Sequence, residues 1–134
     1  MWADLETPLS EAPLFFIEQK DRDPASELER QVSFRQQCRI HLPHVMLAAI
    51  PNAGKRGQKA LNQARSEGAL WGMVDMLAMA PRKIAFLEWK AGRTDPAPHQ
   101  IEIMNRLTRM GFATGVFRTA DSAIAFLRRE GFGL

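Results

Sequence analysis

Residues 74–90 have the sequence VDMLAMAPRKIAFLEWK, in which two short apolar runs lie on either side of a connection that contains Pro81. Two such runs around a proline-containing connection predict a β-hairpin. If residues 80–83 form a four-residue loop, Met79 pairs with Ile84. The register of every other residue in the two strands follows from that pair. The rest of the fold can therefore be built outward from this hairpin.

Three ionic side chains interrupt the apolar hairpin, namely Asp75, Glu88 and Lys90. Counting from the pair above places Asp75 opposite Glu88, and opposed residues point to the same face with Cβ atoms roughly 5 Å apart. Lys90 shares that face because side chains alternate along a strand. Two carboxylates this close repel each other unless a divalent cation lies between them. Such a cation would polarise a phosphate, and Lys90 would stabilise the nucleophile or the developing charge.

A surface hairpin with an ordinary salt bridge is the alternative explanation. A Glu-x-Lys pattern occurs by chance in roughly one of every few chains of this size. Glu18-Gln19-Lys20 is a second instance, with Asp4 upstream at a similar spacing. Pro8 and Pro13 interrupt that segment, so we expect no strand there to hold Asp4. The catalytic interpretation of residues 75–90 therefore depends on the sequence around them.

The composition predicts one globular domain in a reducing compartment. The 134 residues are 46% hydrophobic and 25% charged, and the net charge of +3 is compatible with a polyanionic partner. Cys38 is the only cysteine, which excludes an intrachain disulfide and favours a cytosolic setting. Since no apolar run has membrane-spanning length and no signal peptide is recognisable, we expect a cytoplasmic protein without membrane association.

The flanking sequence predicts an α/β fold with the order αβαββαβα. An arm at 1–25, with room for one short strand at 14–17, precedes a single domain at 26–134. Because the strands are apolar on both faces, we expect a small mixed β-sheet flanked by helices. The predicted elements are a helix from Ser26 to Pro43, a strand at 45–50, a loop at 51–57 and a basic helix to Glu67, the hairpin, a helix at 98–110, a strand at 112–117 and a helix at 120–129.

Apolar spacing predicts the buried side of two helices. The core stripe of the first helix is expected to be Leu28, Val32, Cys38 and Leu42, with Glu27 and Gln31 on its border. That of the helix at 98–110 is expected to be Gln100, Ile103, Met104, Leu107 and Met110, followed by a Gly111 cap. A glutamine among apolar residues suggests a functional group, although Gln100 could instead only cap its helix.

Further motifs occur in a specific order around the hairpin. They are Glu27-x3-Gln31, Ile50-Pro51-Asn52 before a glycine-bearing basic loop, Gly68-x3-Gly72-x2-Asp75, Glu88-Trp89-Lys90, Gln100 at the start of a helix, and Gly111-Phe112. This order, over residues 26–130, resembles the virus-type replication-repair nuclease (VRR-NUC) domain of the PD-(D/E)xK nuclease superfamily. Val74 departs from the family, which usually has proline there.

The resemblance implies a restriction-endonuclease-like core and a Mg²⁺- or Mn²⁺-dependent deoxyribonuclease. It implies a structure-specific endonuclease that acts on branched or junction DNA in replication or repair. Asp75 and Glu88 resemble the metal-binding acids, helped by the backbone carbonyl of Trp89, and Lys90 resembles the catalytic lysine. The family also has an acid on the first helix and a glutamine that lines the site. Those roles fall to Glu27 and Gln100, with Glu27 preferred to Glu29 because it shares the face of Gln31.

Basic residues follow Asn52 and predict contact with DNA phosphates. They are Lys55, Arg56, Lys59 and Arg65, and a solvated helix face is the alternative explanation for them. Gly54-Lys55 lacks the upstream glycine and the following Ser or Thr of a phosphate-binding loop, so no nucleotide cofactor is expected.

A domain of this size carries one active site, so cutting two DNA strands would suit a homodimer. Two other functions are compatible with the sequence. One is a non-catalytic DNA-binding module on a nuclease scaffold, which should keep its affinity when Mg²⁺ is chelated. The other is a structural subunit that docks on a larger replication protein through residues 14–17.

Overall fold

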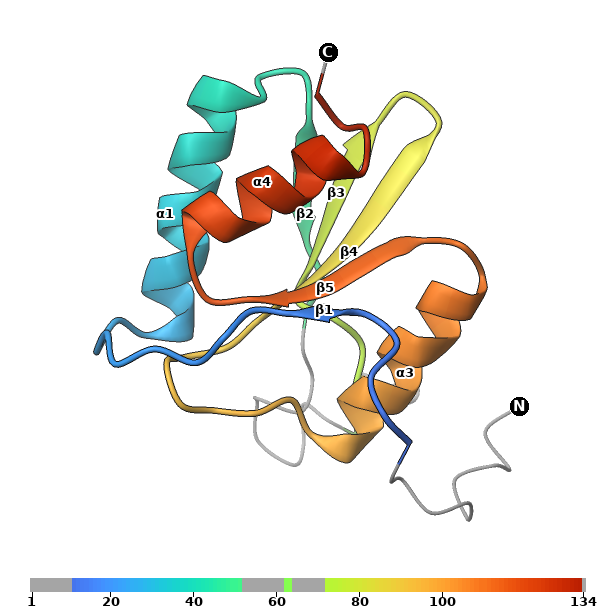
Figure 1. Ribbon diagram of the computed structural model, residues 1–134. Helices are drawn as coiled ribbons and strands as arrows, with labels where there is room; N and C mark the ends of the chain where they lie inside the picture. Colours follow the sequence, from blue (N-terminus) through green and yellow to red (C-terminus); the bar gives the residue numbers. More distant parts are fainter. Residues whose placement is uncertain (1–10, 52–61, 64–71, 134) are drawn as a thin grey trace.

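The computed structural model describes residues 11–51, 62–63 and 72–133 (Figure 1). The predicted hairpin forms strands β3 (Met76–Ala80) and β4 (Lys83–Trp89). The other elements are β1 (Phe16–Ile17), α1 (Glu27–His41), β2 (Met46–Ala49), α3 (Pro98–Arg109), β5 (Ala113–Phe117) and α4 (Ala120–Arg129). The elements predicted within the described residues are therefore present. The helix expected after residue 57 lies largely outside them, although residues 62–63 are helical.

The strands of the described residues form one mixed sheet in the order β1-β5-β4-β3-β2. β2 and β4 both pair antiparallel with β3, whereas β5 runs parallel to β4 and to β1. Parallel neighbours need a long crossover, and α3 provides it between β4 and β5. Helices cover both faces of the sheet (Figure 1), which confirms the expected small mixed sheet flanked by helices.

The hairpin has the predicted register but a shorter turn. Met79 pairs with Ile84, and the ladder extends one further pair toward the turn. The turn is therefore Pro81-Arg82, where a four-residue loop was expected. Arg82 has a φ of 62°, the left-handed conformation that the third position of a type II turn requires. Because the loop loses one residue from each side, the register of the strands does not change.

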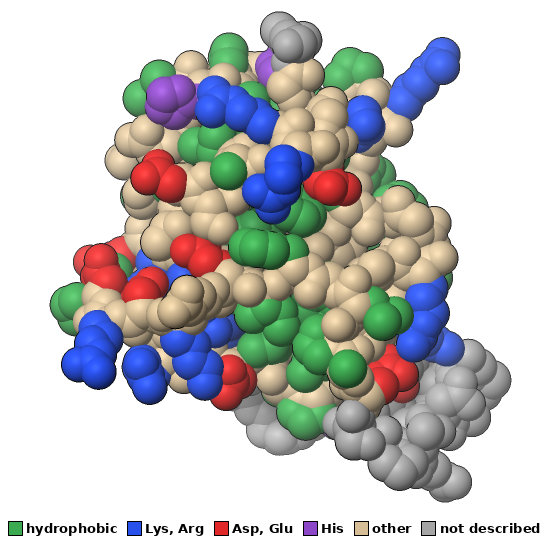
Figure 2. Space-filling view, viewed as in Figure 1, with side chains coloured by type: hydrophobic (Ala, Val, Ile, Leu, Met, Phe, Trp, Pro, Cys, Tyr) green, Lys and Arg blue, Asp and Glu red, His purple; other side chains and the backbone are tan. Residues whose placement is uncertain are grey.

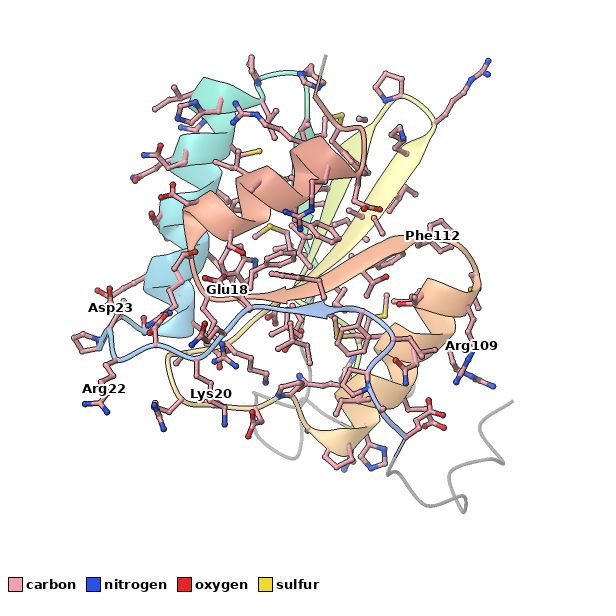
Figure 3. All side chains as sticks on the ribbon, in the orientation of Figure 1. Glu18, Lys20, Arg22, Asp23, Arg109 and Phe112 are labelled. Atoms are coloured by element: carbon pink, nitrogen blue, oxygen red, sulfur yellow. The ribbon has the colours of Figure 1, made fainter. Side chains whose placement is uncertain are left out.

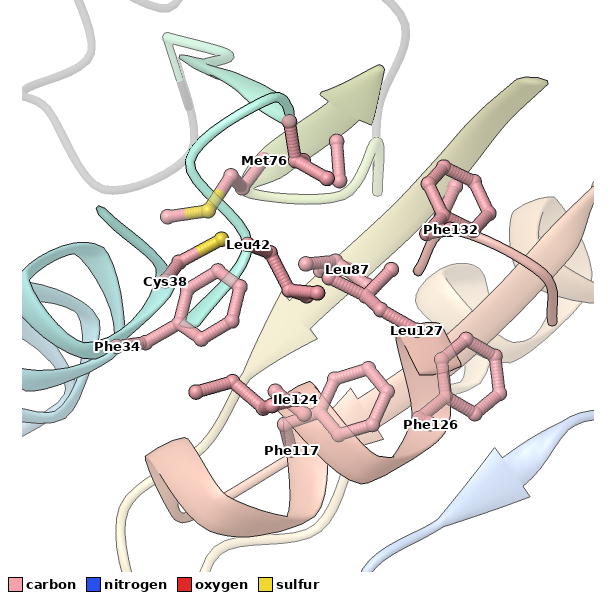
Figure 4. Packing of buried hydrophobic residues seen from close by; sticks show 14 of the residues in the cluster. Phe34, Cys38, Leu42, Met76, Leu87, Phe117, Ile124, Phe126, Leu127 and Phe132 are labelled. Atoms are coloured by element: carbon pink, nitrogen blue, oxygen red, sulfur yellow. The ribbon is translucent and has the colours of Figure 1, made fainter. Parts of the chain in front are cut away.

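Alternate residues of β4 enter two separate cores. Leu87 and Trp89 belong to the core on the side of α1 and α4, and Figure 4 shows this core with Leu87 labelled. Phe86 packs with Met104 of α3 on the other face. Glu88 has the same parity as Phe86 and therefore faces α3. The first core also contains Phe34, Cys38, Leu42, Met76, Phe117, Ile124, Phe126, Leu127 and Phe132, and the second also contains Val74 and Val116.

α1 begins as predicted at Ser26 but buries a different face. The Ser26 hydroxyl accepts from the Glu29 amide and the Glu29 carboxylate accepts from the Ser26 amide, which completes a capping box. The stripe prediction was wrong in its first half, since Leu28 is 65% and Val32 is 37% exposed. The apolar residues of α1 lie on two sides, and packing against the sheet selected the side with the larger ring, Phe34.

α3 buries most of its predicted stripe. Gln100, Ile103 and Met104 are buried, but Met110 is 69% exposed, which corrects the end of that stripe. The reason is that α3 ends at Arg109, with Met110 as its C-cap. Gly111 follows with a φ of 95°, the left-handed conformation expected after a helix.

Candidate functional site

The start of β3 and the end of β4 bring Asp75 and Glu88 together. The last pair of the ladder is Met76 with Leu87, so continuing this register by one residue places Asp75 opposite Glu88. Asp75 Oδ2 accepts a hydrogen bond of 2.8 Å from the Trp89 amide. The two acids are 5% and 0% exposed, respectively. The structure thus buries two carboxylates at adjoining positions of the sheet.

Lys90 and Gln100 both contact the buried Glu88. The Lys90 Nζ lies 3.4 Å from Glu88 Oε2, and the Gln100 Nε2 donates to the same oxygen at 2.7 Å. Gln100 Oε1 accepts from the Ala97 amide at 2.8 Å. Gln100 therefore caps α3 through its oxygen and holds Glu88 through its nitrogen, so the two interpretations of this residue are compatible.

The cluster buries ionic side chains of both signs. Asp75, Glu88 and Lys90 are all buried, and they comprise two carboxylates and one ammonium group. Burying an ion is costly unless an opposite charge or a hydrogen-bond donor compensates it. The ammonium group of Lys90 pairs with Glu88, and the Trp89 amide donates a hydrogen bond to Asp75. Each carboxylate therefore has at least one compensating contact inside the protein.

Trp89 anchors the end of β4 from the opposite face. Its side chain is 0% exposed, and its ring centroid lies 5.2 Å from that of Phe34 and 5.9 Å from that of Phe117. The N–H and C=O of one residue in an extended strand point to the same side. Since the Trp89 N–H points to Asp75, its carbonyl is directed toward that side as well.

Gly72 allows the start of α3 to lie against the segment that leads into Asp75. Gly72 has a φ of 80°, and a Cβ there would lie 2.9 Å from the backbone of His99 and 3.2 Å from the amide nitrogen of Gln100. The contacts at 2.9 Å are closer than a Cβ atom tolerates, and the contact at 3.2 Å would require a small shift of the neighbour. The absence of a side chain at Gly72 therefore lets Gln100 reach Glu88.

Gly72→Ala is expected to destabilise the protein by about 1–3 kcal/mol, through the positive φ and the contact with His99. Gly111→Ala is the matched control, since Gly111 also has a positive φ but a Cβ there would meet nothing within 4 Å. Chemical denaturation of both variants measures the difference. Equal losses for the two variants would show that the close approach of α3 does not matter.

Two buried arginines hold the loops beside Lys90, and the sequence interpretation missed both. Arg118 Nη1 donates to the carbonyl oxygens of Ala91 and Gly92 at 2.6 and 3.2 Å. Arg30 Nη1 donates to the Arg118 carbonyl and to Asp21 Oδ2, both at 2.8 Å. The hydrogen bond from Arg30 lowers the pKa of Asp21. No local pattern could have identified these arginines, because Arg118 lies 26 and 27 residues from the carbonyls that it binds.

The second Glu-x-Lys pattern has a structural role. The Glu18 carboxylate accepts hydrogen bonds from the amide of Arg118 and from the amide and hydroxyl of Thr119. Lys20 pairs with Asp95 at 3.0 Å and is exposed (Figure 3). The Glu18 contacts attach the arm to the start of α4, and the Lys20 pair attaches it to the loop before α3. They involve neither Asp75 nor Glu88.

Glu27 lies in the first turn of α1, partly exposed, on the face of the sheet opposite α3. Among residues 11–51, 62–63 and 72–133, no group of three or more His, Cys, Asp or Glu side chains is arranged to hold a metal ion. The structure therefore gathers Asp75, Glu88, Lys90 and Gln100, without Glu27 as a third acid. Glu29 is used in the capping box, and its hydrogen bond with the Ser26 backbone lowers its pKa.

The predicted phosphate contacts lie outside the described residues. They are Asn52, Lys55, Arg56, Lys59 and Arg65. Within the described part of the chain, no helix is both long enough and apolar enough to cross a membrane. Comparison of the chain with family models, curated proteins and solved structures finds no match.

Proposed function

We propose that this chain is a divalent-metal-dependent deoxyribonuclease of the VRR-NUC type, with a restriction-endonuclease-like core. The observation that carries the proposal is the pair of buried carboxylates, Asp75 and Glu88, with the ammonium group of Lys90 beside them. A preference for branched or junction DNA, in replication or repair, rests on the sequence resemblance. A cytoplasmic location agrees with the single cysteine, Cys38, which is buried as a free thiol.

The donor set at the ends of β3 and β4 fits Mg²⁺ or Mn²⁺. Mg²⁺ in enzymes is usually held by one or two carboxylates, with waters and substrate phosphates as the other ligands. Asp75 and Glu88 would provide those carboxylates, and the Trp89 carbonyl is directed to the same side. A bound cation would polarise the phosphate and lower the pKa of a coordinated water.

Lys90 provides fixed positive charge where the phosphate would be attacked. Its side chain is 8% exposed, so water screens the ammonium group less than it would at the surface. A positioned cation of this kind stabilises charge that develops in a transition state. Gln100 acts through Glu88, since its amide donates to Oε2 and restricts the carboxylate to one orientation.

Exposed basic residues lie on the two loops that flank Lys90. Lys20, Arg22 and Arg93 are exposed. The Asp21 amide donates to the Gly92 carbonyl, so the two loops are adjacent. Figure 2 shows Lys and Arg side chains at this end of the molecule, near the loop that Figure 3 labels at Lys20 and Arg22. Such residues would contact DNA phosphates, which provide affinity without sequence preference.

The test is cleavage of a labelled four-way junction and a matched linear duplex with Mg²⁺, Mn²⁺ or EDTA. We expect metal-dependent products from the wild type, and a loss of at least about 10²-fold in Lys90→Ala, because a transition-state cation is removed. Lys83→Ala is the control, since Lys83 is an exposed lysine at the opposite end of β4. The junction-to-duplex ratio measures the structural preference.

Intact DNA in every lane, with a gel shift that EDTA does not change, would contradict the nuclease proposal. That result would assign the chain to the alternative class, a DNA-binding module that has a nuclease scaffold without the activity. A far-ultraviolet circular dichroism spectrum of Lys90→Ala identical to that of the wild type excludes misfolding as the cause of lost cleavage.

A further inference from the structure

Lys90 lies where the chain leaves the sheet, one residue beyond the end of β4. Its amide donates to the Phe117 carbonyl at 3.1 Å, and its Nζ lies 3.4 Å from Glu88 Oε2. A lysine side chain has a flexible four-carbon stem, so its ammonium group keeps one position only if the backbone that carries it is fixed. The contacts of the residues after Lys90 therefore decide how well this ammonium group is placed.

Arg118 holds the two residues that follow Lys90. Its Nη1 donates to the carbonyl oxygens of Ala91 and Gly92, and its Nε donates to the Glu18 carbonyl at 3.0 Å. Arg118 is 1% exposed, so water does not compete for these hydrogen bonds. A charged donor also forms stronger hydrogen bonds than a neutral one. One buried guanidinium group therefore ties the Lys90 segment to the arm.

The arm packs directly against the same segment. A Cβ at Gly92 would lie 2.6 Å from the Asp21 carbonyl oxygen, and the Asp21 amide donates to the Gly92 carbonyl at 3.0 Å. Arg30 donates to the Asp21 carboxylate and to the Arg118 carbonyl, both at 2.8 Å. Through Arg30, α1 therefore fixes the two residues that hold the loop after Lys90.

We propose that Arg118 is a positioning residue for Lys90 in the cleavage reaction. The hydrogen bonds of its side chain all go to backbone carbonyls, so it acts through the backbone of Ala91 and Gly92. Where a reaction depends on a placed charge, a displacement of about 1 Å costs on the order of 10²-fold in rate. The inference rests on the proposed function, in which Lys90 stabilises the transition state.

A phosphate contact is the alternative role for Arg118. Its Nη2 is buried and has no hydrogen-bond partner in the described part of the chain. DNA would reach that nitrogen only if the loop opened, since Arg118 is 1% exposed. The two roles differ in kinetics, because a positioning residue changes the rate and a phosphate contact changes the DNA concentration at half-saturation.

Arg118→Met distinguishes the two roles by single-turnover cleavage over a range of DNA concentrations. Methionine removes every donor of the side chain, so the rate at saturating DNA should fall at least about 10-fold. The DNA concentration at half-saturation should change by less than about threefold, because the exposed basic residues are kept. Arg118→Lys should recover most of the rate, since its ammonium group can donate to the carbonyls of Ala91 and Gly92.

Asn105→Ala is the matched control. Asn105 is 0% exposed and holds the other end of the arm, since it accepts from the Leu14 amide at 2.7 Å and donates to the Ala12 carbonyl at 3.0 Å. Both substitutions loosen the arm, but only Arg118→Met releases the segment after Lys90. Measured well below its Tm, Asn105→Ala should cleave at the wild-type rate.

Amide hydrogen exchange gives a readout that needs neither DNA nor metal. The Lys90 amide should lose at least about 10-fold more protection in Arg118→Met than the amides in the middle of β4, because the opening is local. Gly92→Ala should give the same local loss, since its Cβ pushes the arm away while Arg118 is kept. Gly92→Ala carries the test if Arg118→Met does not fold.

The two proposals fail separately. A wild type that cleaves no DNA rejects the nuclease function, and the exchange data then still decide whether Arg118 fixes the Lys90 segment. Cleavage by Arg118→Met at the wild-type rate would overturn the positioning role, and so would an equal rate loss in Asn105→Ala. A raised half-saturation concentration with an unchanged rate would make Arg118 a phosphate contact instead. Equal losses of protection at Lys90 and in the middle of β4 would leave Arg118 only a general stabilising role.

Discussion

Asp75→Asn is expected to lower the rate of metal-dependent DNA cleavage by at least about 10³-fold, which corresponds to roughly 4 kcal/mol of transition-state stabilisation. The substitution removes one of two carboxylates that would hold the cation. It keeps the shape of the side chain, and the amide oxygen of asparagine can still accept from the Trp89 N–H. The loss should therefore come from chemistry and not from unfolding.

Single-turnover cleavage with Mg²⁺ or Mn²⁺ measures this effect, and thermal unfolding provides a second readout. Any ligand that binds only the folded state raises its stability. The Tm of the wild type should therefore rise on addition of Mn²⁺, and that of Asp75→Asn should not. Asp95→Asn is the control, because Asp95 is an exposed acid that pairs with Lys20. Wild-type cleavage by Asp75→Asn would remove Asp75 from the site.

Trp89→Ala should reduce the free energy of unfolding by about 3–5 kcal/mol, the range for deleting a large aromatic side chain from a core. Trp89 is fully buried and contacts the rings of Phe34 and Phe117. It therefore joins α1 to the centre of the sheet. Because Glu88 and Lys90 are its neighbours in β4, we also expect the remaining folded fraction to lose cleavage activity.

Urea denaturation at fixed temperature measures the loss, with Phe112→Ala as the control. Phe112 also makes an aromatic contact, with Phe86, but it is 37% exposed. Removal of the Phe112 side chain should cost about 1 kcal/mol of unfolding free energy, since Phe112 buries less apolar surface on folding than Trp89 does. A Trp89→Ala loss as small as that of Phe112→Ala would contradict the view that Trp89 anchors the site.

The hairpin was predictable because its information is local. Two apolar runs and one proline were enough to predict the Met79–Ile84 pair, and strand alternation then placed Glu88 and Lys90 on one face. The shorter turn did not matter, since it preserved that pair. The limits of α1 and α3 were equally local, because Ser26 and Gly111 act on the backbone within one helical turn.

The buried side of α1 was not predictable from periodicity. Its apolar residues occupy both sides of the helix, and spacing alone does not rank Leu28 and Val32 against Phe34. Contact between the Phe34 and Trp89 rings decides the rotation, and these residues belong to separate segments of the chain. The same rotation leaves Leu28 and Val32 exposed.

The sequence by itself determined the hairpin register, the helix ends and the pairing of Asp75, Glu88 and Lys90, because each depends on residues within a short stretch of chain. Tertiary structure alone decided three contacts. They are the hydrogen bond of Gln100 with Glu88, the close approach of α3 to Gly72, and the hydrogen bond from Arg118 to the carbonyl of Ala91, next to Lys90. These contacts join residues that are 12 to 28 positions apart, and they form only when α3 and β5 pack against the hairpin. Local propensity carries no information about such packing.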